Sequence, residues 1–181
     1  MNTPIGSGGT TVKGNRSLSP ITLDDLARLG RIAREDRESF FARLPRYRAL
    51  EDRVIAVALC QGAAAHFLDG KNGVKDFDVW TFYAAHPDAT YPDRRRVARD
   101  FGDPKFGQTL DQMRFVGRRV DLLGRSLKAL PDSDPAEVLH TYLTERRTKS
   151  AKHLASKVVV LIEPTDREGQ VVWPDSYTAL T

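Results

Sequence analysis

The fold is decided by VIAVALCQGAAAHFLDG at residues 54–70 and KDFDVWTFYA at residues 75–84. The first stretch opens with a short apolar run rich in β-branched residues, which is typical of a buried strand. Gln61-Gly62 ends the run, and the alanines after it predict a short helix over residues 63–68. The second stretch alternates in its first half, which predicts another strand. We therefore expect an α/β (α+β) fold, a mixed sheet flanked by helices.

The flanking sequence predicts further elements of the same domain. A helix is expected to begin at Thr22 as N-cap, with Asp25 three residues later, and to end before Pro45. Asp134 is expected to cap another helix. We expect a short basic helix over residues 93–101, strands over 115–123, 157–162 and 171–173, and helices over 135–143 and 149–157.

Bulk properties bound the class of protein. The 181 residues fit one domain, which we place at residues 19–181 after a flexible polar tail at residues 1–18. A single cysteine, Cys60, excludes a disulfide within the chain and is typical of a cytoplasmic protein. No apolar run approaches the roughly 20 residues that span a bilayer, so we expect no membrane partner. The net charge of +4 is compatible with a phosphate-bearing ligand.

Three aspartates form the candidate site. Asp76 and Asp78 are two residues apart on an expected strand, so their carboxylates point the same way and repel. Asp121 interrupts the next apolar strand, where the alternatives are a place beside the other two or an ion pair with Arg118 or Arg119. Three such oxygen donors suit Mg²⁺ or Mn²⁺.

The ordered segments VIAVALCQGAAAHFLDG, KDFDVW and RRVDLL resemble the nucleotidyltransferase superfamily, which includes DNA polymerase β and many small bacterial members. The resemblance implies that Asp76, Asp78 and Asp121 are catalytic and hold the metal. It also implies that Gly62 and Ala63 let the backbone approach the phosphates of a nucleotide.

Other side chains have two readings each. Lys71 and Lys75 flank the aspartate pair, where they contact a triphosphate or only keep a loop soluble. His66 is either a packed core or helix-face residue or a ligand. Trp80 is either a core residue or a surface on which a base stacks. Arg94, Arg95, Arg96 and Arg99 form a basic cluster that is either solvated or binds a polyanion.

The expected function is therefore metal-dependent transfer of a nucleotidyl group from an NTP donor to an unknown acceptor, which is a small molecule, a protein or a nucleic acid. The alternative is a non-catalytic binding module of the same fold or a toxin–antitoxin component. Ala63 stands where the family has a serine, and the sequence shows no second domain to hold an acceptor. Both observations favour the alternative.

Overall fold

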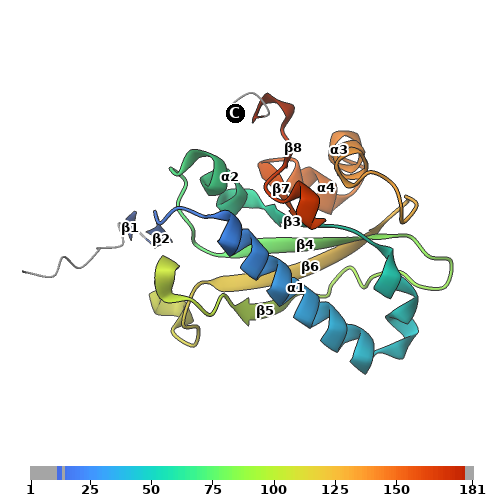
Figure 1. The fold of residues 1–181 in the computed structure, drawn as a ribbon, viewed down its shortest axis with the longest axis horizontal. Coiled ribbons are helices and arrows are strands. Elements are labelled where there is room, and N and C mark those ends of the chain that lie inside the picture. The colour runs from blue at the N-terminus through green and yellow to red at the C-terminus, as the bar shows by residue number, and fades with distance from the viewer. Residues whose placement is uncertain (1–11, 14, 178–181) are drawn as a thin grey trace, which may run out of the picture.

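A six-stranded mixed sheet dominates the computed structural model, which describes residues 12–13 and 15–177 (Figure 1). The strand order is β5-β6-β4-β3-β7-β8. Strands β4 and β6 run parallel, and the other neighbouring pairs run antiparallel. The strands are β3 (Val54–Cys60), β4 (Phe77–Ala84), β5 (Val97–Asp100), β6 (Arg119–Leu127), β7 (Val158–Glu163) and β8 (Val171–Trp173). The expected α+β fold with a mixed sheet is confirmed.

Helices cover both faces of this sheet. The helices α1 (Leu23–Arg43) and α2 (Gln61–Asp69) pack on one face, and α3 (Pro135–Glu145) and α4 (Lys149–Leu154) pack on the other. In Figure 1, α1 crosses in front of β4 and β6. Shorter elements are strands β1 (Val12–Lys13) and β2 (Arg16–Ser17) and the 3₁₀ helices Pro45–Arg53, Pro104–Phe106, Leu110–Gln112, Thr165–Arg167 and Asp175–Tyr177. Within the described residues, no helix is both long and apolar enough to cross a membrane.

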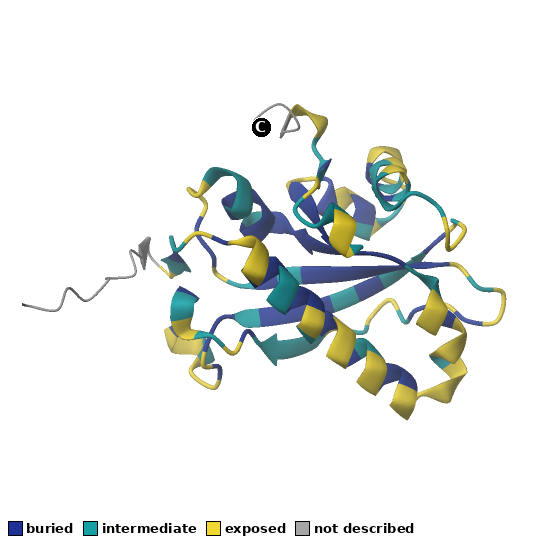
Figure 2. Ribbon diagram, viewed as in Figure 1, coloured by how far each residue is buried: buried dark blue, intermediate teal, exposed yellow. Residues whose placement is uncertain are grey.

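Alternating side chains of the central strands form two separate apolar cores. Leu59, Val79 and Leu122 face α1 and α2. Ala58 and Trp80 face α3 and α4. Both faces of β3 and β4 are therefore buried, as the dark colour of these strands in Figure 2 shows, and this explains their nearly continuous apolar sequence.

The start of α1 confirms the expected cap. The side chain of Thr22 accepts a hydrogen bond from the backbone N–H of Asp25, and the carboxylate of Asp25 accepts one from the N–H of Thr22 at 2.8 Å. This reciprocal pair satisfies two backbone donors that a helix N-terminus otherwise leaves free. Leu44 then ends α1, and Pro45 begins the following 3₁₀ helix.

The basic helix expected over residues 93–101 is wrong. This segment leads into the edge strand β5, which pairs antiparallel with β6. The third strand also begins later than expected, at Arg119 instead of residue 115. The carboxylate of Asp100 accepts hydrogen bonds from the backbone N–H groups of Val116 and Gly117, at 2.6 and 2.9 Å, and so holds residues 116–117 in a loop.

The expected tail at residues 1–18 is too long. Ser17 is fully buried and exchanges two backbone hydrogen bonds with Val74, at 2.9 and 2.7 Å. Arg16 donates a hydrogen bond from its side chain to the carbonyl of Gly73 at 3.3 Å. Residues 15–18 therefore belong to the folded domain, and residues 1–11 and 14 lie outside the described residues.

Candidate functional site

The register of β4 and β6 brings two of the three candidate aspartates side by side. Asp78 and Asp121 are direct partners in this parallel pair. Residues paired in register share one face of a sheet, so both carboxylates lie on the face that carries α3 and α4. Asp76 directly precedes β4 and is close enough to raise the pKa of Asp78. The register therefore brings Asp78 and Asp121 together, and Asp76 is linked to them only through its charge.

Asp78 has a raised pKa. Burial is the largest cause, and the negative charges of Asp76 and Asp121 add to it, so that the pKa of Asp78 rises to about 6. Both effects disfavour the ionised form. A cation placed beside Asp78 would relieve both, so the position favours binding of positive charge.

Asp121 is already neutralised by two arginines. Its side chain is fully buried, with Arg96 Nη2 at 2.6 Å from Oδ2 and Arg119 Nη2 at 2.7 Å from Oδ1. The expected alternative of an ion pair is confirmed for Arg119, whereas Arg118 donates to the carbonyl of Phe106 instead. Across the described part of the chain, no three His, Cys, Asp or Glu side chains form a ready-made metal centre.

Sequence reasoning placed Arg96 in the basic cluster but did not connect it with Asp121. In β5, Ala98 pairs with Asp121, and Arg96 lies two residues earlier on the same face. Arg95 and Arg99 point to the other face, where they pair with the buried Asp36 of α1 at 2.7 and 2.9 Å. The basic cluster is thus divided between two faces of the sheet and largely engaged in ion pairs. Arg94 is exposed.

The N-terminus of α2 lies next to the aspartates. Helix α2 begins directly after Cys60, and Cys60 is the register partner of Asp78. Gln61 adopts a positive φ of 66°, and its side-chain amide donates to the carbonyl of His153 at 2.9 Å. A Cβ added to Gly62 would lie 3.4 Å from Arg16 Nη1, so this glycine faces a positive charge. Free backbone N–H groups at a helix N-terminus attract anions.

Ala63, Lys71 and Lys75 lie less favourably for contact with a nucleotide than the N-terminus of α2 does. Ala63 is buried in the core between α2 and the sheet. Lys71 follows Gly70, which ends α2, and nine helical residues span roughly 13 Å, so Lys71 lies at the opposite end of α2 from Gly62. Lys75 is exposed and directly precedes Asp76. The charge of Lys75 acts on Asp111, and no contact of Lys75 or Lys71 with the three aspartates is seen among the described residues.

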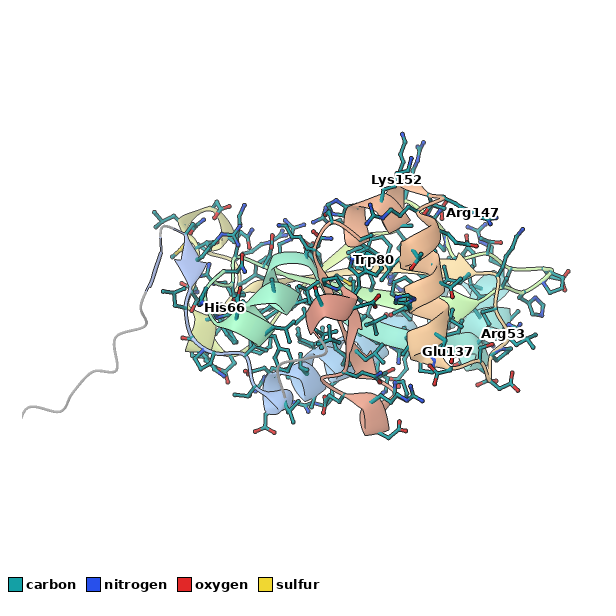
Figure 3. The ribbon with its side chains drawn as sticks, turned by 90° about the horizontal axis from the view of Figure 1, so that it is seen from above. Arg53, His66, Trp80, Glu137, Arg147 and Lys152 are labelled. Carbon is teal, nitrogen blue, oxygen red and sulfur yellow. The ribbon has the colours of Figure 1, made fainter. Side chains whose placement is uncertain are left out.

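His66 shapes the loop that leads to Asp76. Its Nδ1 accepts a hydrogen bond from the backbone N–H of Gly73 at 2.9 Å, which leaves the proton on Nε2, at 3.0 Å from the carbonyl of Ser19. Figure 3 shows its position on α2. Trp80 packs in the core, with its ring stacked on that of Phe82, so the core reading holds for both residues.

Comparison with known proteins adds no family to this picture. No family model, curated protein or solved structure matches the chain. The class that the coordinates define is an α+β domain with an acidic cluster between β4 and β6, at the N-terminus of α2.

Proposed function

We propose that this protein is a metal-dependent nucleotidyltransferase that moves a nucleotidyl group from an NTP to an acceptor hydroxyl. The observation that carries the proposal is the parallel register of β4 and β6, in which Asp78 is the direct partner of Asp121. The start of α2 beside Asp78 supports it, because the same end of the sheet then offers both carboxylates for metal and backbone N–H groups for phosphate.

Asp76 and Asp78 would hold Mg²⁺ or Mn²⁺, with Asp121 completing the set. The donors fit such an ion, since they are carboxylate oxygens. Burial, together with the negative charges of Asp76 and Asp121, raises the pKa of Asp78 to about 6, and a cation would offset both effects. A carboxylate oxygen has about two lone-pair sites, so Asp121 keeps acceptor capacity beyond its arginines. The bound ion would supply charge neutralisation for the triphosphate and for the attacking and leaving oxygens.

The remaining groups act directly on the nucleotide. The N–H groups at Gly62 and the next residues would bind phosphate oxygens. Arg96 is half exposed while it contacts Asp121, so its remaining N–H groups are available to a phosphate. In the reaction, the acceptor oxygen bonds to the α-phosphorus and the bond from that phosphorus to the bridging oxygen breaks. Pyrophosphate leaves with the electron pair, and the hydroxyl proton passes to water.

Calorimetric titration with Mg²⁺ plus each NTP tests this proposal on the native protein and on the Asp76→Asn/Asp78→Asn variant. We expect saturable binding to the native protein and loss of it in the variant, because neutral amides replace both metal-binding charges. Asp132→Asn is the matched control, since Asp132 is an exposed aspartate outside the cluster. Equal heats from the native protein and the double variant would contradict the proposal.

The second candidate is a non-catalytic binding module or toxin–antitoxin component. The two ion pairs that already neutralise Asp121 support it, as does Ala63 in the place of the family's serine. This reading predicts that the protein binds a nucleotide without releasing pyrophosphate. It also predicts that Asp78→Asn leaves any cellular effect of the protein unchanged.

A further inference from the structure

A pocket of about 320 Å³ lies between the second half of β6 and helix α3, and we call it the β6–α3 pocket. Its volume is in the range of sites that hold small molecules. The side chains that matter for its chemistry are Arg125, Lys128, Tyr142, Glu145, Arg147 and Thr148.

The β6–α3 pocket opens on the same face of the sheet as the aspartate cluster. Residues 121, 123, 125 and 127 of β6 alternate onto this face. Arg125 is four residues beyond Asp121, which corresponds to roughly 13 Å along the strand. Leu123 lies between them, only partly buried, with Trp80 as its register partner. The partly buried Leu123 and the buried Trp80 therefore lie between the pocket and the cluster along the sheet.

The charge of the pocket favours an anion. Arg125, Lys128 and Arg147 line it together with one carboxylate, that of Glu145, which pairs with Arg147 at 3.1 Å. Arg125 pairs with Asp93 at 2.9 Å, but the side chain of Asp93 is 63% exposed. Such solvent-exposed pairs contribute little, so a phosphate can compete for these cations. In Figure 3, Arg147 and Lys152 lie on the same side of the molecule, which extends the positive charge.

Tyr142 gives the pocket a defined aromatic wall. Its ring packs edge-on against Phe82, and its hydroxyl is hydrogen-bonded to Thr148 Oγ1 at 2.9 Å. These two contacts fix the ring before any ligand arrives. A fixed aromatic surface beside several cations suits a ligand that has both a flat or apolar part and an anionic group.

We propose that the β6–α3 pocket binds the phosphate end of the nucleotidyl acceptor, a phosphorylated small molecule about 10 Å or more in length. This inference rests on the proposed function, which places the reacting hydroxyl at the aspartate cluster. In the proposed function, the triphosphate of the donor binds at the N-terminus of α2, near the start of β4 and β6. The other end of β6 therefore remains free for the acceptor. The size of the pocket favours a small molecule over a protein or nucleic-acid chain.

Amide NMR of the full chain with AMP as the probe, without Mg²⁺ or NTP, tests the pocket. We expect saturable shifts at the amides of Lys128 and Thr148 and none with adenosine, which lacks the phosphate. The Arg125→Ala/Lys128→Ala variant should bind AMP at least about tenfold more weakly. The control Arg31→Ala/Lys157→Ala removes two exposed cations outside the pocket and should bind as the native protein does.

The Asp78→Asn variant separates this inference from the proposed function. It should lose Mg²⁺–NTP binding and keep AMP binding unchanged, because Asp78 does not line the β6–α3 pocket. Three outcomes would overturn the assignment of the pocket. They are no saturable shift up to about 10 mM AMP, shifts centred on Gly62 and Asp78, and equal weakening in the control variant. If AMP binds as expected but no NTP does, the pocket stands and the proposed function fails.

Discussion

Asp78→Asn should make the protein more stable at neutral pH while removing its proposed activity. The pKa of Asp78 rises from 3.8 to about 6 because of burial, with smaller contributions from Asp76 and Asp121. Each pKa unit corresponds to about 1.4 kcal/mol, so ionised Asp78 costs the folded state about 3 kcal/mol at full strength. Asparagine has nearly the same shape without the charge, but its side-chain amide needs hydrogen-bond partners of its own. We therefore expect the free energy of unfolding to rise by about 2 kcal/mol in the variant.

The sign of this effect depends on pH. A carboxyl group whose pKa is raised by folding does not destabilise the folded state at a pH below its ordinary pKa of 3.8, because there it is protonated in both the folded and the unfolded state. The cost grows through the interval up to about 6 and is complete above it. The gain from Asp78→Asn should therefore be present at about pH 8 and nearly absent at about pH 4.

Urea denaturation followed by tryptophan fluorescence measures this difference in the free energy of unfolding. At about pH 8, a gain of 2 kcal/mol corresponds to an increase of roughly 4–8 °C in Tm for a chain of this length. Asp132→Asn, at an exposed position, should change neither value. Mg²⁺ should stabilise the native protein and not the Asp78→Asn variant. Lower stability of the variant at about pH 8 than the native protein, or an equal gain at both pH values, would refute the reasoning.

Other substitutions test the contacts around the cluster. Arg96→Met removes one of the two ion pairs of the buried Asp121. We expect the free energy of unfolding in urea to fall by about 1–2 kcal/mol, and Mg²⁺ to restore part of it. A loss of stability that Mg²⁺ does not change would count against Asp121 as a metal ligand. Asp36→Asn leaves Arg95 and Arg99 facing a neutral amide. It should lower the free energy of unfolding by about 3 kcal/mol, measured by thermal unfolding. An unchanged Tm would show that these ion pairs contribute nothing to stability. Gly124→Ala places a Cβ 2.7 Å from the ring of Tyr91 and should cost about 1–3 kcal/mol. A midpoint in urea equal to that of the native protein would contradict this packing.

Local patterns predicted much of the fold because they report burial directly. Strand β3 and helix α2 were expected within one or two residues of their observed bounds, since an apolar β-branched run and an alanine-rich run have different preferences. The cap at Thr22 was also predictable, because a capping box involves residues only three apart. The order of the strands in the sheet could not be predicted, because it depends on contacts between distant parts of the chain.

The site was predicted in part for the same reason. The spacing of Asp76 and Asp78 predicted a common direction on one strand, but β4 begins one residue after Asp76. The register therefore places only Asp78 beside Asp121. Arg96 was placed in a basic cluster but not linked to Asp121, because residues 94–99 alternate in no apolar pattern and were expected to form a helix. The pairing of β5 with β6 decides which arginine reaches Asp121. The ion pair of Asp121 with Arg119 was foreseeable, because the two residues are only two apart on one strand. The pair with Arg96 is a tertiary arrangement, which no local spacing encodes.

The hydrogen bonds between Ser17 and Val74 matter for anyone who shortens this polypeptide to obtain better crystals. The glycine-rich beginning of the sequence suggests a truncation just before α1. Such a cut would also remove the Arg16 side chain that holds the carbonyl of Gly73, three residues ahead of Asp76. The trimmed protein would keep the strands of its sheet but lose the core residue Ile21, and the approach to its acidic cluster would be loosened. Inactivity of the trimmed protein would therefore not count against the proposed function.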